Sequence, residues 1–152
     1  MDKTVVKEHI VLAAAKSFAL KAVKTVRMDD IAAGLSISKR TLYELFHDKE
    51  DLLLDVMKLH RAEMQEYMTQ VASKAENVLE VLLKFFQRSA QDFQNTNRKF
   101  FEDIEKYPKV MRYIDESRKE NLDSAMEFYR KGVEQGIFRN DVNYNIVRAM
   151  VC

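Results

Sequence analysis

The chain has 152 residues, of which 47% are apolar and 32% charged, a balance that excludes an intrinsically disordered protein. Only three Gly and one Pro interrupt a sequence rich in Leu, Ala, Met, Lys and Glu, so we expect an all-α fold. The formal net charge of +1 excludes a general attraction to nucleic acid or membrane, and any DNA-binding role must rest on local charge.

The single cysteine, Cys152, excludes an intrachain disulfide framework and a cysteine-rich metal site, which suits a reducing cytoplasm. The N-terminus lacks the apolar core of a signal peptide, and no stretch approaches the roughly 20 apolar residues that span a bilayer. We therefore expect a cytoplasmic protein. His9, His47 and His60 are too widely spaced for a local metal motif, so we expect neither metal nor cofactor.

The first half of the chain predicts four helices. Residues 3–22 repeat apolar residues at four-residue steps, the stripe of an amphipathic helix. Short helices are expected over residues 28–35 and 39–46, with Ser38 as the cap of the second. Asp48 can cap a long helix that runs towards Val71.

The second half predicts further helices over residues 77–94, 98–105, 108–116 and 118–135. Pro108 suits a first helical turn, and Gly136 is a natural helix end. A last periodic run begins at Asp141 and stops at Cys152.

The stretch "MDDIAAGLSISKRTLYELF", residues 28–46, holds two apolar patterns around a Ser-Ile-Ser turn. The small Ala32 lies where two short helices must cross closely. This is the packing that a helix-turn-helix requires, with its second helix free to enter a major groove. Its inward apolar residues are Ile31, Leu35, Ile37, Leu42 and Leu45.

The second of these helices carries two different faces. At 100° per residue, Leu42, Leu45 and Phe46 share one arc, and the opposite arc holds Lys39, Arg40, Tyr43, Glu44 and His47. Lys and Arg can meet phosphates or guanine edges, Tyr43 can contact the backbone, and Lys49 can hold a phosphate at the next helix start. The predicted DNA contacts are Arg27, Ser38, Lys39, Arg40, Thr41, Tyr43, His47 and Lys49.

Charge supports this prediction only weakly. Residues 1–61 hold eleven Lys and Arg against nine Asp and Glu. A solvated helix with scattered charge explains Lys39 and Arg40 equally well if they are taken alone, and the whole apolar pattern favours the helix-turn-helix.

The run "RMDDIAAGLSISKRTLYELFHDKEDLL", preceded by "HIVLAAAKSFALKAVKTV", resembles the N-terminal region of TetR-family transcriptional regulators. The later segments "FFEDIEKYPKVMRYI" and "GVEQGIFRNDVN" are similar to the regulatory domain of some members. The resemblance covers nearly the whole chain and is most specific in its first fifty or so residues. It implies a DNA-binding domain over residues 1–47 and a helical domain over 48–152 that binds an inducer and forms a homodimer.

Three positions depart from the family pattern. Ala22 and Ser36 stand where Gly is usual, and Arg27 stands where Ser or Thr usually caps the helix. A missing cap costs about 1 kcal/mol, and a non-Gly residue at positive φ costs roughly the same. Packing would have to offset the missing cap, and Gly34 lies close enough to let the turn adjust.

The chain also ends earlier than the family pattern. Family members usually continue for a few tens of residues through two long helices that form a four-helix bundle between protomers. We expect the chain to be truncated, since Ile146, Val147 and Met150 form an apolar stripe with little left to cover it.

Residues 85–129 are rich in aromatic side chains, which we expect to be ordinary core: Phe85, Phe86, Phe93, Phe100, Phe101, Tyr107, Tyr113, Phe128 and Tyr129. A subset would line a ligand cavity between helices. The candidates are Met64, Tyr67, Phe86, Phe101, Tyr113 and Tyr129.

Nothing in the sequence favours an enzyme. The acidic stretch "FFEDIEK" has no nucleophile motif beside it and is expected to be a solvated helix face. We therefore expect a ligand-responsive DNA-binding regulator, most simply a repressor that an inducer releases from a near-palindromic operator. The alternative is a helical ligand-binding or protein-interaction module that does not bind DNA.

Overall fold

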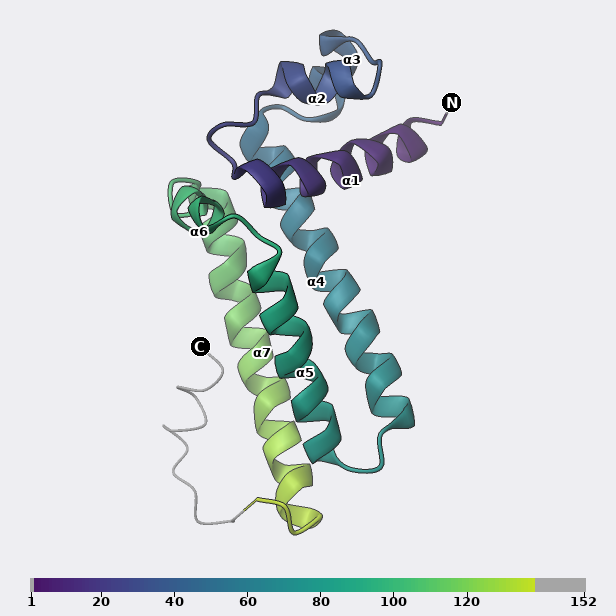
Figure 1. The fold of residues 1–152 in the computed structure, drawn as a ribbon, viewed down its shortest axis with the longest axis vertical. Coiled ribbons are helices and arrows are strands. Elements are labelled where there is room, and N and C mark those ends of the chain that lie inside the picture. The colour runs from purple at the N-terminus through teal and green to yellow at the C-terminus, as the bar shows by residue number, and fades with distance from the viewer. Residues whose placement is uncertain (1, 139–152) are drawn as a thin grey trace. The chain divides into compact units, whose positions relative to one another are not determined.

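A computed structural model describes residues 2–138 of the chain (Figure 1), and this part forms seven helices without a strand. The all-α fold predicted from composition is confirmed. The helices are α1 Lys3–Lys21, α2 Met28–Gly34, α3 Lys39–Leu45, α4 Lys49–Lys74, α5 Val78–Gln94, α6 Arg98–Ile104 and α7 Pro108–Glu134.

The predicted break in the last described helix is wrong. Residues 108–116 and 118–135 were expected as two helices, whereas α7 runs through without interruption. Ser117 is buried within it, and Asp115 and Arg118 form an ion pair one turn apart at 3.6 Å. Because residues 115–120 contain neither Gly nor Pro, their charges are compatible with a continuous helix. The run predicted from Asp141, with its apolar stripe, lies outside the described residues.

The chain packs into two compact units. Among the described residues, the first unit comprises 2–63 and 91–111, and the second comprises 64–90 and 112–138. Helices α4, α5 and α7 contribute residues to both units. The two units are defined by packing. The predicted boundary after residue 47 instead separates a DNA-binding region from a regulatory region, and it stays a prediction.

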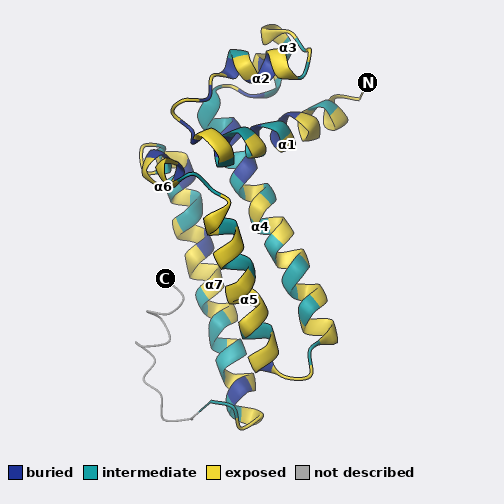
Figure 2. Cartoon of the chain, viewed as in Figure 1, coloured by how far each residue is buried: buried dark blue, intermediate teal, exposed yellow. Residues whose placement is uncertain are grey.

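The core of the first unit joins α1, α3 and α4. Ile10, Phe18, Leu42, Leu52 and Leu53 are fully buried, and the buried positions of these helices stand out in Figure 2. Burial of one such side chain contributes roughly 1.5 to 3 kcal/mol. Apolar packing between the helices therefore stabilises α1, α3 and α4 more than the hydrogen bonds within each helix could alone.

The described part of the second unit closes with a turn that requires a glycine. The N–H groups of Ile137 and Phe138 both donate to the carbonyl of Gly132, and the Phe138 ring folds back over that residue. A Cβ at Gly132 would overlap the ring. Gly136 has a φ of 74° and ends α7 as predicted.

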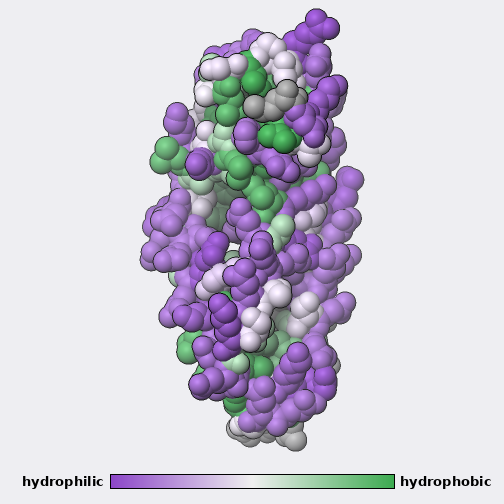
Figure 3. All heavy atoms as spheres, turned by 90° about the vertical axis from the view of Figure 1, so that its right-hand side faces the viewer, coloured by the Kyte–Doolittle hydropathy of each residue, from purple (hydrophilic) through white to green (hydrophobic). Residues whose placement is uncertain are grey.

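The face of the molecule shown in Figure 3 is mostly hydrophilic, with hydrophobic patches among the hydrophilic residues. Across residues 2–138, every helix is either too short or too polar to cross a membrane. Phe85, Phe86, Phe93 and Phe101 are exposed, so the expectation that they are ordinary core is wrong. Phe85, Phe86 and Phe93 lie on α5 together with the exposed Leu79 and Leu83, so apolar residues of this helix are not confined to the side that packs against the rest of its unit.

Candidate nucleic-acid interface

A tight turn joins α2 to α3. The N–H of Ser36 donates to the carbonyl of Ala33 at 3.1 Å, and the N–H of Ile37 donates to the carbonyl of Ala32 at 3.0 Å. Ser36 adopts a φ of 55°, so the left-handed conformation falls on the residue that replaces the usual Gly. Gly34 remains the last residue of α2, and the expectation that it would relieve the turn is wrong.

The start of α3 is capped as predicted. Ser38 Oγ accepts the N–H of Thr41 at 3.1 Å, and the two hydroxyl oxygens lie 2.9 Å apart. Both hydroxyls therefore stabilise the helix start. Leu42, one turn further on, is fully buried and anchors the inner side of α3.

The outer side of α3 is open to solvent. Lys39, Arg40, Tyr43 and Glu44 are all exposed, with Tyr43 at 48%. The predicted arc is confirmed for these four residues. It is wrong for His47, because α3 ends at Leu45 and the backbone of Phe46 is extended with φ −132° and ψ 122°. His47 is exposed but follows the helix.

Each exposed cation of this surface has a carboxylate beside it. Lys39 Nζ lies 2.8 Å from Asp29 Oδ2, and an Arg27 guanidinium nitrogen lies 4.0 Å from the same oxygen. Arg40 Nε donates to Glu44 Oε1 at 3.2 Å. Exposed pairs of this kind contribute about 0 to 1 kcal/mol each, so phosphates or bases can replace the carboxylates at little cost.

Helix α2 forms although its N-terminus lacks a side-chain cap. Arg27 has the extended conformation of an N-cap residue, φ −100° and ψ 144°, but makes no capping hydrogen bond. Met28, Ile31 and Ala32 are buried in the domain. As expected from the sequence, the packing of these residues offsets the missing cap at Arg27.

Lys49 has an internal hydrogen-bond partner. Its Nζ donates to the carbonyl of Val23 at 2.6 Å, in the loop between α1 and α2. Burial lowers the pKa of Lys49, and the nearby Asp103 carboxylate opposes that decrease. The start of α4 is capped as predicted, since the N–H of Asp51 donates to Asp48 Oδ1 at 2.9 Å. Contact between Lys49 and a phosphate stays a prediction.

Asp103 is a structural residue that the sequence analysis missed. The expectation of a solvated face is wrong here, because Asp103 is only 7% exposed and its Oδ2 accepts the N–H groups of Val23 at 3.1 Å and Lys24 at 2.8 Å. It holds α6 against the loop after α1. The available signal was its position three residues after the buried Phe100, on the same helix face.

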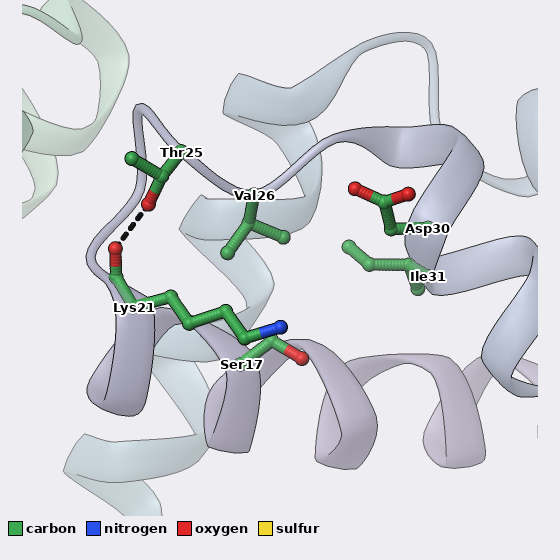
Figure 4. Close-up of a pocket in the computed structure, with 6 residues that line it drawn as sticks. All are labelled: Ser17, Lys21, Thr25, Val26, Asp30 and Ile31. Carbon is green, nitrogen blue, oxygen red and sulfur yellow. Dashed lines mark hydrogen bonds between the residues drawn. The ribbon is translucent and has the colours of Figure 1, made fainter.

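A small pocket of about 110 Å³ lies between α1 and α2. Figure 4 shows the Lys21 side chain extending along α1 beside Ser17, and the Thr25 hydroxyl donating to the Lys21 carbonyl. Ligand pockets usually measure about 300 to 1,000 Å³, so this one is too small for a typical inducer. Its lining contains none of the predicted ligand residues: Ser17, Lys21, Thr25, Val26, Asp30 and Ile31.

The predicted ligand residues fall in both compact units. Phe101 belongs to the first, where it stacks on Phe93 with ring centroids 5.2 Å apart. The other five belong to the second. Phe86 is exposed, whereas the remaining four are half-buried: Met64, Tyr67, Tyr113 and Tyr129.

Two of these half-buried residues have aromatic or cationic neighbours. The Arg88 guanidinium carbon lies 4.8 Å from the ring centroid of Tyr67, a cation–π geometry. Tyr129 stacks on Phe138 at 6.0 Å. Their role in binding a ligand stays a prediction.

Comparison with known proteins gives the same assignment as the helix-turn-helix geometry. Residues 10–56 match the family described as "Bacterial regulatory proteins, tetR family". The chain is 30% identical over 108 residues to the uncharacterized HTH-type transcriptional regulator YvaF of Bacillus subtilis. That match covers 70% of this chain and 54% of YvaF, so the chain spans about half the length of this relative.

Solved structures share the fold at low sequence identity. A putative transcriptional regulator from Saccharomonospora viridis, in complex with choline, is 18% identical with a TM-score of 0.81, over 97% of this chain and 79% of that one. The fatty acid degradation regulator FadR from Bacillus halodurans is 21% identical with a TM-score of 0.73, over 95% and 77%. The tetR-family match therefore covers the helix-turn-helix and the start of α4, and the likeness to these solved structures shows that the described residues share the fold of transcriptional regulators.

Proposed function

We propose that the protein is a cytoplasmic, ligand-responsive, sequence-specific DNA-binding regulator. It represses transcription as a homodimer on a near-palindromic operator. The observation that carries this proposal is the two-sided character of α3: Leu42 fixes its inner side in the core, and Lys39 and Arg40 remain exposed on its outer side.

The exposed side chains suit a major groove. Arg40 has the fork geometry that binds the O6 and N7 atoms of guanine, and Lys39 and Arg27 suit phosphates. Tyr43 can donate a hydrogen bond to a phosphate of the DNA backbone. In a dimer, two such helices would enter successive major grooves roughly 34 to 36 Å apart.

Regulation by a small molecule is the second part of the proposal. Residues 48–152 would bind the inducer and form the dimer, with Tyr67 and Tyr113 among the half-buried candidates for the pocket. The similar structure from S. viridis is a complex with choline, and another similar structure is a gamma-butyrolactone receptor. An inducer would favour the state in which the two α3 helices no longer match the groove spacing, by as much as its affinities for the two states differ.

A selection experiment tests the proposal. The purified chain is offered a random duplex library, and its oligomeric state is measured by sedimentation. We expect enrichment of a two-fold-symmetric sequence by a dimer. A folded, dimeric chain that enriches no sequence would overturn DNA binding and favour the ligand-binding or protein-interaction module.

Variants of the outer face locate the contact. Arg40→Ala should weaken binding to the selected sequence about tenfold or more and relax the base preference at one position in each half-site. Tyr43→Ala should weaken binding as well. Lys119→Ala, which removes an exposed cation from α7, is the matched control and should bind as the wild type. Unchanged binding by Tyr43→Ala would remove that residue from the contact set.

A further inference from the structure

We propose that Glu44 determines part of the operator sequence by accepting a hydrogen bond from the amino group of a cytosine, next to the guanine that Arg40 binds. The inference rests on the proposed function and assigns a role to the one acidic side chain on the outer face of α3.

Glu44 and Arg40 form a single exposed unit on α3. Glu44 follows Arg40 by four residues, and Arg40 Nε donates to Glu44 Oε1 at 3.2 Å. The Arg40 side chain is 89% exposed, and the Glu44 side chain is 54% exposed. Since both belong to the face opposite the buried Leu42, a groove that receives Arg40 also receives the carboxylate.

A carboxylate in a major groove discriminates strongly between bases. It only accepts hydrogen bonds, and the groove edges of guanine and thymine offer N7, O6 and O4, which are also acceptors. Adenine places its N7 acceptor beside its amino group. Cytosine offers an amino donor alone and is the base that Glu most suitably contacts.

The negative charge makes this preference stronger. Glu44 approaches a polyanion, and without a donor its carboxylate would be repelled by phosphates and desolvated against acceptor atoms. Sequences that lack the amino group at this position are therefore penalised, which is specificity by exclusion as well as by attraction.

The contact between the two side chains places the cytosine one base pair from the guanine. Arg40 Nε and Glu44 Oε1 lie 3.2 Å apart, close to the roughly 3.4 Å between neighbouring base pairs, and a fork-shaped contact from Arg40 already occupies both acceptors of its guanine. The carboxylate then reaches the neighbouring pair. The operator half-site is expected to contain adjacent G·C pairs, one read by each side chain.

A simpler role for Glu44 would be to orient Arg40 through their ion pair. Pairs four residues apart on a helix are weak, and this one is solvated. If orientation were its only role, loss of Glu44 would reduce the preference for the guanine and leave the cytosine unaffected. The two roles therefore change the preference at different positions.

The test compares selections by wild type, Arg40→Ala, Glu44→Ala, Glu44→Gln and Glu105→Gln. Arg40→Ala identifies the guanine position. We expect Glu44→Ala to lose about fivefold or more of its discrimination at the adjacent cytosine, and to bind unrelated duplexes more tightly than the wild type. Glu44→Gln should shift the preference at that position from cytosine to adenine, because an amide can bind adenine N6 and N7. Glu105→Gln removes one exposed carboxylate from the end of α6 and should leave every preference unchanged.

The outcomes separate this inference from the function on which it rests. In one outcome, the wild type enriches an operator, but both Glu44 variants keep its preference for the cytosine or lose only the preference for the guanine. Glu44 then does not read a base, and this inference alone is overturned. If the wild type enriches no sequence, the proposed function fails and the inference fails with it. Circular dichroism of both Glu44 variants confirms that they are folded, since the side chain is exposed and packs in no core.

Discussion

Lys49 and Asp103 bind opposite sides of one peptide group. The Lys49 ammonium donates to the carbonyl of Val23, and the N–H of Lys24, which belongs to the same peptide, donates to the Asp103 carboxylate. The start of α4 and the helix α6 thereby hold one point of the loop that leads from α1 into the helix-turn-helix. A movement of α6 would change the hydrogen bonds of that loop directly.

Asp103→Ala is expected to lower the free energy of unfolding by about 2 to 4 kcal/mol. The substitution leaves two N–H groups without their charged acceptor, that of Val23 at a buried bond and that of Lys24 at a partly buried one, and a buried donor without a partner is costly. Urea unfolding followed by circular dichroism measures the effect. Asp103→Asn should lose less, because one amide oxygen can accept both bonds.

The adjacent Glu102 provides the control for Asp103. It is exposed on the same helix, so Glu102→Ala should change the free energy of unfolding by no more than about 0.5 kcal/mol. Equal losses from Asp103→Ala and Glu102→Ala would show that the two loop contacts contribute nothing specific.

Lys49→Ala is expected to weaken binding to all duplexes. The dependence of affinity on salt should become shallower, by the equivalent of about one fewer ion released on binding. This follows if the ammonium leaves Val23 for a phosphate when DNA is bound. Fluorescence anisotropy over a salt series measures the slope. A folded Lys49→Ala variant with the wild-type affinity and slope would refute the phosphate contact and leave Lys49 with its structural role alone.

Much of the fold could be predicted from local patterns. The apolar stripe that places Ile10, Ala14 and Phe18 in the core is visible as a four-residue repeat, and Ser38 and Asp48 are helix caps by residue type and position. The outer face of α3 follows from the same periodicity, because its inner face is fixed by Leu42.

The contacts that join distant segments could not be predicted in this way. Asp103 meets Val23 across 80 residues of sequence, and Lys49 meets it across 26. No local period encodes such pairs. The continuity of α7 was missed for a different reason: a charged run without Gly or Pro is equally typical of an exposed helix and of a connection, and only packing around Ser117 decides between them.

Ala22→Gly is expected to raise the free energy of unfolding by about 1 kcal/mol. Ala22 has φ 66° and ψ −178°, a region that is essentially restricted to glycine and costs other residues roughly 1 to 3 kcal/mol. Loss of the buried methyl group and the greater freedom of the unfolded chain offset part of this gain. Ser36→Gly should give a smaller gain, because φ 55° lies in the less costly left-handed helical region.

The matched control for these glycine variants is Ala33→Gly. Ala33 is exposed within α2 and has no positive φ, so its replacement should lower the free energy of unfolding by about 1 kcal/mol. Urea titrations of the three variants compare them. A loss for Ala22→Gly as large as that for Ala33→Gly would contradict the strained conformation at the end of α1.

Arg27→Thr is expected to move stability and DNA affinity in opposite directions. Arg27 already has the backbone conformation of an N-cap residue, and a threonine hydroxyl there can accept an N–H of the first turn of α2, which contributes about 1 kcal/mol. The same change removes a cation that lies 4.0 Å from Asp29 at the edge of the predicted contact surface. The melting temperature should therefore rise, while fluorescence anisotropy should report weaker DNA binding with a shallower dependence on salt.

Arg27→Ala is the control for this variant. It supplies neither the cap nor the charge, so it should lose DNA affinity without the gain in stability. If Arg27→Thr melts higher and binds DNA as tightly as the wild type, the cap is real and Arg27 is not a DNA contact, since the two effects arise from different atoms of the same residue.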